Sequence, residues 1–369
     1  MIVDCSRDRS LLLHTESSAD INVIMHKLFL VVVRSGLIAA LVLPFMSLAA
    51  STTTDAVGFV SMTIRGTQGV VPEATSYVSL PMVHPVRVRA TVASVDGGRI
   101  TLKPNSESKF DWAAAALDAS WYIEISSGNY AGVAATIQGS AANEVTTHED
   151  LSEVLSPGDL IVVRQYVTLG DVFGVHNRAG LGSGTSAAEA DTITLVDPRT
   201  KAMTVYYYHA SDSGAVGWVT PGDPEEKSAT PIFPDTGFIV RRKAADDLQV
   251  VLPGHVPTQS AVMPIERGLN LVAARFPVDR TLNEIFPAGG PLTGGEGYSE
   301  TDTVAVPDQF GQLVAYRYRT TGPGGPGWYG GGEPTPVGDQ VVIRPGDLLL
   351  VNRSHGEAVN YIQTAPYNL

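Results

Sequence analysis

Short apolar runs recur along the chain, and in many of them apolar residues alternate with polar or small ones. Between positions 314 and 319, for example, Val and Tyr alternate with Ala and Arg. A period of two places one set of side chains on a buried face of a strand and the other set in water. In the N-terminal region the predicted strands are Val57–Ile64, Tyr77–Met82, Val86–Val95, Arg99–Lys103, Tyr122–Ile125, Ala131–Gln138 and Leu160–Val167. The pattern predicts an all-β fold with few short helices.

An internal match organises the second half of the chain. Residues 160–257 and 271–366 show the same succession of a capping-box Thr with an acid three residues later, an aromatic strand, a Gly-rich loop, a Gly-Trp pair and a turn into a last strand. The turn before the last strand of the second module reads Pro-Gly-Asp at positions 345–347, and the same phrase occurs earlier at positions 157–159. Pro fixes φ and Gly accepts a positive φ, so the phrase predicts a tight turn. We therefore expect an N-terminal β-domain and two related β-modules, each a sandwich or a small open barrel.

The aromatic strand of the first module indicates which side chains are buried. Three tyrosines and a histidine occupy positions 206–209. By alternation, Tyr206 and Tyr208 are predicted to face the core, and Tyr207 and His209 are predicted to face solvent.

A Trp follows the aromatic strand at the same distance in both modules, at Trp218 and Trp328. The last strand of each module begins 20 residues after this Trp, at Phe238 and at Leu348. The matched spacing predicts that the two sets of residues occupy equivalent places in two copies of one small β-unit.

The N-terminal region contains the three parts of a secretory signal peptide. Lys27 and Arg34 give a basic start, Leu37–Met46 is apolar, and small residues end the segment at Ala49-Ala50. The alternative is a membrane anchor, but Arg34 leaves fewer uncharged residues than the roughly 20 that a spanning helix needs. We expect cleavage and export to the periplasm, the outer surface or the extracellular space.

These observations divide the chain into five expected segments. Residues 1–24 lie upstream of a plausible start at Met25 and are expected not to be translated or to be disordered. Residues 25–49 are the expected signal peptide. The expected N-terminal β-domain covers 50–159, and the two β-modules cover 160–269 and 270–369.

Several of these features together resemble a protein family. The segments that carry the resemblance are Val57–Val60, Tyr206–Tyr208, Gly217-Trp218 and Phe238–Arg242. This set is similar to a family of uncharacterised exported bacterial β-rich proteins, and the likeness covers about Asp55 to Arg353. The second module departs from it, because Arg317 interrupts the Tyr triplet. The resemblance implies export and supplies no catalytic residue.

Composition and charge exclude several classes of function. The chain has a formal charge of −13 and no run of five Lys or Arg, so it lacks the basic cluster that nucleic-acid binding requires. Its single cysteine, Cys5, precedes the expected signal peptide, so the mature chain has no disulfide and no cysteine-based zinc site. No His spacing predicts a metal site, and we expect no cofactor.

Acidic residues precede one strand of each module at matching positions. Glu189 with Asp191, and Glu300 with Asp302, offer oxygen ligands for an adventitious Ca²⁺. The simpler interpretation, which we prefer, is that these carboxylates are solvated at the start of a strand.

Few side chains are candidates for binding, and none is a candidate for catalysis. Tyr207, Trp218, Trp328 and Tyr329 have rings that can stack on sugars, or they pack across their hairpins, which the matched spacing favours. The neighbouring residues Arg241 and Arg242 have guanidinium groups for a carboxylate or sulfate, or they form the solvated end of a strand.

Three hypotheses about function remain. The first is a non-enzymatic binding or structural component of the cell surface or extracellular space, with a carbohydrate or surface component as its partner. The second is a secreted hydrolase that acts on polysaccharide, which two facing carboxylates in a cleft would favour. The third is self-association into a fibre or layer.

Overall fold

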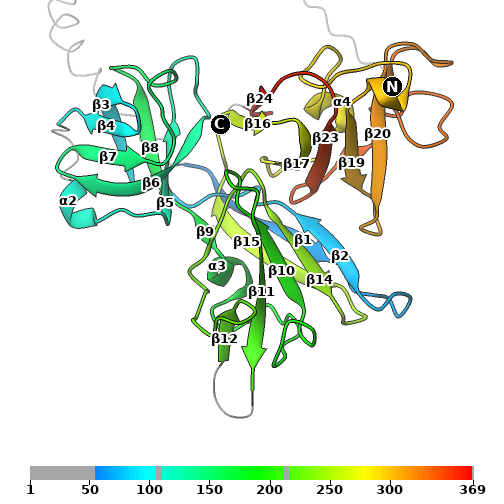
Figure 1. Ribbon diagram of the computed structural model, residues 1–369, viewed down its shortest axis with the longest axis horizontal. Coiled ribbons are helices and arrows are strands. Elements are labelled where there is room, and N and C mark those ends of the chain that lie inside the picture. Colours follow the sequence, from blue (N-terminus) through cyan, green and yellow to red (C-terminus); the bar gives the residue numbers. More distant parts are fainter. Residues whose placement is uncertain (1–54, 105–109, 212–215, 368–369) are drawn as a thin grey trace, which may run out of the picture. The chain divides into compact units, whose positions relative to one another are not determined.

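The computed structural model describes residues 55–104, 110–211 and 216–367. The expected signal peptide and the segment before it, including Cys5, lie outside the described residues. The described chain is all-β with a few short helices, so the predicted fold class is confirmed. Its strands form a closed barrel and two modules, each built around a five-stranded sheet (Figure 1).

The barrel is formed by six strands in the order β3-β4-β7-β6-β5-β8. These strands are β3 (Val88–Asp96), β4 (Arg99–Leu102), β5 (Trp121–Ile125), β6 (Ala134–Ala141), β7 (Glu144–Thr147) and β8 (Leu160–Gln165). The short helix α2 (Trp112–Ala115) packs its Trp112 against the barrel core. Inward-facing apolar residues such as Val92, Ile123 and Ile137 are fully buried. Small barrels are filled by their own side chains in this way.

The first module combines strands from both sides of the barrel sequence. They are β1 (Val57–Ile64), β2 (Ala74–Val78), β9 (Val167–Thr168), β10 (Thr192–Val196), β11 (Met203–Ala210), β12 (Val216–Val219), β13 (Pro231–Ile232), β14 (Phe238–Arg242) and β15 (Leu248–His255). The sheet order is β12-β11-β10-β14-β2, while β1 pairs with β15 and β13 pairs with β9. The helix α3 (Leu169–Phe173) follows β9. Because β2 precedes the barrel and β9 follows it, the barrel is inserted into this module.

The second module is continuous in sequence. Its strands are β16 (Ala261–Ile265), β17 (Gly268–Ala273), β18 (Arg280–Thr281), β19 (Thr303–Pro307), β20 (Leu313–Arg319), β21 (Gly327–Tyr329), β22 (Val342–Ile343), β23 (Leu348–Arg353) and β24 (Val359–Gln363). The sheet order is β17-β23-β19-β20-β21, while β16 pairs with β24 and β18 pairs with β22. The helices are α4 (Leu282–Ile285) and η2 (Tyr298–Glu300).

The two modules have corresponding strand orders and helix starts. Each begins with one strand of a two-stranded ribbon and ends with the other, β1 with β15 and β16 with β24. Each short helix is capped by a Thr that receives the backbone N–H of the acid three residues later, Thr168 before α3 and Thr281 before α4. Both predicted capping boxes are therefore confirmed.

Strand pairing places the domain boundaries at other residues than the sequence predicts. β1 and β2 fall in the expected segment 50–159 but pair with β15 and β14, whereas β8 falls in 160–269 and completes the barrel. β16 and the start of β17 precede residue 270 and belong to the second module. The sequence match missed β1, β2 and β16 and aligned β17 with β8, because the barrel separates β1 and β2 from the rest of the first module.

Strands β14 and β23, which the sequence match took as the last strand of each module, correspond with a shift of one residue relative to that match. Phe238 pairs with Leu195, two residues beyond Ile193 on β10. In the second module Val304 is the counterpart of Ile193, because the two residues pair with Tyr316 and Tyr206 of the aromatic strands, and Val304 pairs with Val351. Two residues before Val351 lies Leu349, a fully buried core residue as Phe238 is. The counterpart of Phe238 is therefore Leu349 and not Leu348, so the equal 20-residue spacing from Trp was misleading.

Candidate functional site

The tyrosines of β11 are buried on both faces of the sheet. Tyr206 and Tyr208 lie in the core of the first module, as predicted. Tyr207 was predicted to face solvent, but only 7% of it is exposed, because Ala190, Val219 and the partly buried Ala187 cover it. The loop before β10 therefore folds over the second face of the sheet.

Both Trp residues pack inside their modules. Trp218 contacts Phe173 and Tyr208, and its Nε1 donates to the Gly174 carbonyl at 2.9 Å. In the second module Trp328 is buried, and its Nε1 donates to the Phe286 carbonyl at 2.8 Å. Neither indole is open to a ligand, so the matched spacing reflects packing.

Tyr329, the fourth aromatic candidate, is also buried. Its hydroxyl donates to the Gly325 carbonyl at 2.6 Å, and the Arg319 guanidinium lies 4.9 Å from the ring centroid. Both the hydroxyl and the ring are occupied by contacts within the protein. The structure therefore brings none of the four aromatic candidates together at a surface.

The two arginine candidates lie next to each other in the sequence but in opposite environments. Arg241 is exposed, and its Nε lies 3.9 Å from a Glu73 carboxylate oxygen. Arg242 is buried, and its Nη1 lies 2.9 Å from Oδ2 of Asp191. The side chain of Asp191 is 1% exposed. The expectation that Asp191 is solvated at a strand start is therefore wrong.

Backbone amides complete the environment of Asp191. Its Oδ2 accepts the N–H of Gly182 at 2.7 Å, and its Oδ1 accepts the N–H of Lys243 at 2.8 Å. The Arg242 Nε donates to the Asp246 carbonyl. The pair joins the loop before β10 to the end of β14, which is a structural role.

The second module contains the same arrangement around Asp302, which is fully buried. Its Oδ2 accepts the N–H of Thr293 and its Oδ1 accepts the N–H of Ser354. Nη1 of Arg353 lies 3.7 Å from Oδ2, and its Nε donates to the Glu357 carbonyl. Asp302, like Asp191, was expected to be solvated and is not. A polar arrangement thus occurs in both modules as the packing residues do.

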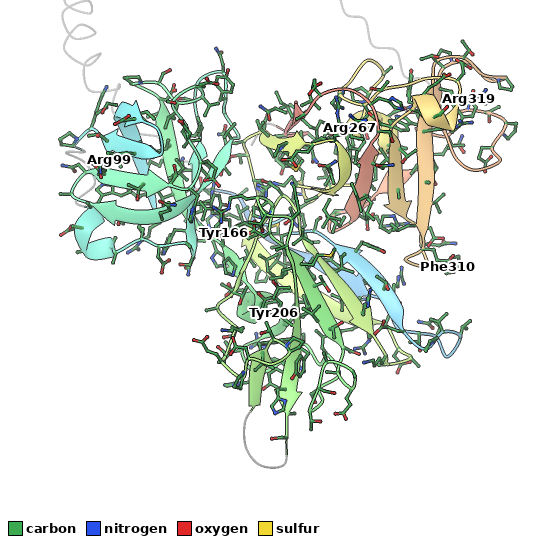
Figure 2. The ribbon with its side chains drawn as sticks, in the orientation of Figure 1. Arg99, Tyr166, Tyr206, Arg267, Phe310 and Arg319 are labelled. Carbon is green, nitrogen blue, oxygen red and sulfur yellow. The ribbon has the colours of Figure 1, made fainter. Side chains whose placement is uncertain are left out.

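A cleft of about 400 Å³ lies between strands β1 and β2 and three turns of the second module. Its charged residues are Arg65, Asp279, Asp308, Arg344 and Asp347, and its aromatic residues are Phe59 and Tyr77. Phe59 is 73% exposed. The turn between β19 and β20 reaches the cleft with Asp308 and Gly311 and exposes Phe310 at its tip (Figure 2).

Several polar atoms of the cleft have no partner among the described residues. Asp347 uses Oδ2 to accept the Arg344 amide at 2.7 Å, which leaves Oδ1 free. Asp308 similarly uses only Oδ1, for the amides of its own turn. The Tyr77 hydroxyl and the Asp279 carboxylate have no partner within the described part of the chain, whereas Arg65 is held by Asp247 at 2.7 Å. The cleft therefore offers both hydrogen-bond donors and acceptors.

The carboxyl group of Asp347 has an unusual affinity for its proton. Burial raises the pKa of Asp347 to about 6, and the nearby charge of Asp279 raises it further, while the Arg344 amide and guanidinium oppose the change. Desolvation disfavours the charged form of a carboxyl group. A carboxyl group with a shifted pKa in a cleft is typical of functional sites.

We expect Asp347→Asn to change the pH dependence of stability. The folded protein holds this proton up to about pH 6, whereas an unfolded Asp releases it near 3.8, so ionisation disfavours the folded state. Stability should fall by about 2–3 kcal/mol as the pH rises from about 4 to about 6, and then stay lower. The variant should escape this loss and be the more stable protein at about pH 7.5.

Urea unfolding of both proteins across this pH range measures the effect. Asp159→Asn is the matched control, because Asp159 accepts the Ser156 amide at 2.8 Å in the same Pro-Gly-Asp turn within the barrel. Gly158 and Gly346 have φ of +100° and +94° in the two turns, as their sequence predicts. Equal pH slopes for the wild type and Asp347→Asn would contradict the raised pKa.

Sequence reasoning missed the cleft, although it noted the turn that holds Asp347. In the described part of the chain, no group of three or more His, Cys, Asp or Glu residues is arranged to hold a metal ion. The same residues include no helix with the length and apolar character to cross a membrane. Comparison with protein-family models, with curated proteins and with solved structures finds no match for this chain.

Proposed function

We propose that this protein is exported and binds a polyhydroxylated ligand, such as an oligosaccharide, as a non-enzymatic component of the cell surface or extracellular space. The observation that carries the proposal is the cleft, where the exposed ring of Phe59 lies beside free carboxylate and hydroxyl oxygens. Export rests on the signal-peptide pattern of residues 25–49.

The chemistry of the cleft suits sugar hydroxyls. The free oxygens of Asp279, Asp308 and Asp347 accept hydrogen bonds from hydroxyl groups, and the exposed guanidinium of Arg344 donates them. The electron-rich faces of Phe59 and Tyr77 attract the weakly positive C–H groups on one side of a sugar ring. An apolar surface with a few convergent polar groups is typical of ligand sites.

The correspondence of the two modules supports a scaffold that arose by duplication. The strand orders, the capped helices, the buried Trp residues and the Asp–Arg pairs recur, but the cleft groups do not recur as a set. We infer that the repeated residues maintain the fold and that the cleft supplies recognition.

One observation favours a hydrolase as the second candidate function. Glycoside hydrolases use two carboxyl groups, one of which keeps its proton at the working pH and acts as a general acid. Asp347, with its pKa of about 6, and the neighbouring Asp279 form such a pair. Release of reducing sugar by the wild type, and its loss in Asp347→Asn, would favour this candidate over binding alone.

We expect Phe59→Ala to weaken oligosaccharide binding by about tenfold, because the loss of an exposed ring that packs on the ligand removes about 1–2 kcal/mol. A glycan array identifies the ligand, and calorimetric titration of residues 50–369 gives the affinities. The control is Tyr130→Ala, which removes a 41% exposed aromatic ring from the barrel, away from the cleft. Equal affinities for the wild type and Phe59→Ala would exclude the cleft as the binding site.

A further inference from the structure

The closed barrel has an open mouth above its packed core. Val163 and Ile123 pair across β8 and β5 and belong to the barrel core. Gln165 and Trp121 pair two residues further along the same strands. Side chains two residues apart lie on the same face of a strand, so Gln165 and Trp121 face the barrel axis at its end.

A cavity of about 380 Å³ occupies this mouth. Its lining residues are His84, Pro85, Val86, Arg87, Ala115, Leu117, Trp121 and Gln165. Leu117 belongs to the barrel core, and Trp121 packs against that core, so they give the cavity an apolar floor. The mouths of β-barrels are frequent sites of small-molecule binding.

Three hydrogen-bonding groups in the lining have no hydrogen-bond or ion-pair partner among the described residues. The Arg87 guanidinium, the Trp121 indole N–H and the Gln165 amide make no hydrogen bond or ion pair with any residue that the structure describes. Arg87 is held in place through its backbone N–H, which donates to the Val163 carbonyl at 2.8 Å. Its guanidinium carbon lies 5.8 Å from the Phe110 ring centroid, a cation–π distance.

The charge of the mouth is opposite to that of the whole chain. The protein has a formal charge of −13, but among the residues that the structure describes no Asp or Glu lines this cavity. The other ionisable lining residue, His84, already faces an acid, because its Nε2 lies 3.6 Å from Oδ2 of Asp171. Arg87 is therefore a positive charge beside an apolar floor, with no acidic partner in the described part of the chain.

We propose that the barrel mouth binds a small ligand that carries a carboxylate on an apolar ring or chain. The planar guanidinium of Arg87 matches a carboxylate with two parallel hydrogen bonds. The indole N–H of Trp121 and the amide of Gln165 donate to the remaining lone pairs, and the apolar body packs on Trp121 and Leu117. The site is separate from the cleft and does not depend on the function proposed for it.

Titration of the protein covering residues 50–369 with sodium glucuronate and sodium benzoate tests the proposal. Both probes carry a carboxylate, one on a sugar ring and one on an aromatic ring, and glucose and benzamide are their uncharged counterparts. The indole N–H resonance of Trp121, identified with Trp121→Phe, reports occupancy of the mouth. We expect at least one carboxylate to shift this resonance, and its uncharged counterpart to bind at least about tenfold more weakly.

Arg87→Gln is expected to weaken binding of that carboxylate by about tenfold or more, because it removes the paired charge. Arg89→Gln is the matched control. Arg89 lies two residues away, its side chain is 63% exposed, and it lies near Asp55 and outside the cavity lining. Thermal unfolding checks that both variants remain folded.

The outcomes distinguish the possible sources of the ligand. A response to glucuronate alone supports an acidic sugar, and a response to benzoate alone supports an aromatic acid. A Trp121 resonance unmoved by both carboxylates, or equal affinities for the wild type and Arg87→Gln, would overturn the proposal. Phe59→Ala should leave this titration unchanged, which separates the mouth from the cleft.

Discussion

Arg242→Ala is expected to lower the free energy of unfolding by about 3–5 kcal/mol, because it leaves the buried Asp191 carboxylate without its counter-ion. The side chains of this pair are 8% and 1% exposed, so water cannot replace the guanidinium. The two amide hydrogen bonds to Asp191 remain but do not neutralise its charge. Urea unfolding at neutral pH measures the change.

The adjacent residue provides the control for this prediction. Arg241 lies on the same strand, but its side chain is 59% exposed and 3.9 Å from Glu73. Arg241→Ala should cost no more than about 1 kcal/mol, as exposed pairs do. Similar losses for the two variants would show that Asp191 does not depend on Arg242. Arg353→Ala should repeat the large loss in the second module, where Asp302 is fully buried.

Trp218→Ala is expected to lower the free energy of unfolding by about 3–5 kcal/mol, as removal of a large buried ring does. Trp218 is fully buried, and its indole N–H satisfies the carbonyl of Gly174 just after α3. The substitution leaves a cavity beside Phe173 and Tyr208 and removes this hydrogen bond. Denaturant unfolding followed by far-UV circular dichroism measures the loss.

A milder variant and an exposed ring complete this test. Trp218→Phe keeps most of the apolar volume and should show a smaller loss, which remains measurable if the alanine variant does not fold. Phe310→Ala should change stability by no more than about 0.5 kcal/mol, since the ring is 68% exposed. A loss below about 1 kcal/mol for Trp218→Ala would contradict the assigned packing role.

Hydrophobic alternation predicts the inner face of a sheet better than its outer face. The period of two correctly placed Tyr206 and Tyr208 in the core. It failed for Tyr207, because the loop before β10 covers the second face of the sheet. A strand's own sequence does not reveal which other segment covers its outward side chains. For this reason fold class was predictable and exposure was not.

The buried Asp–Arg pairs have a signal in the sequence, which is their equal spacing in the two modules. Arg242 follows Asp191 by 51 residues, and Arg353 follows Asp302 by the same number. Two acids and two arginines at one spacing in two related segments indicate pairing more strongly than either residue type alone. Because the two acids lie at the start of a strand, they were expected to be solvated. They are not solvated, because the loop before the strand buries them.

The cleft could not be predicted from any local pattern. Phe59 lies on the first strand and Asp347 in one of the last turns, and only tertiary packing brings them to one cavity. The barrel mouth is closer to what sequence reasoning can predict, since Trp121 directly precedes the predicted strand Tyr122–Ile125 and Gln165 lies near the end of the predicted strand Leu160–Val167. Its recognition still required the pairing of β5 with β8.

Because the barrel is inserted into the first module, the strands of the two modules become available for pairing on different schedules during synthesis. In the first module, Ser61 of β1 contacts Gln249 of β15, which is synthesised 188 residues later. The entire barrel is synthesised between these two strands and can close before β15 exists. Until then the apolar side chains of β1 have no partner strand, and such distant contacts form slowly. The second module receives all its strands between residues 261 and 363 in one uninterrupted stretch. The two modules therefore have similar architectures but assemble at different times. A chain whose synthesis stops before residue 248 has a complete barrel, and the strand β1 that precedes the barrel lacks its partner β15.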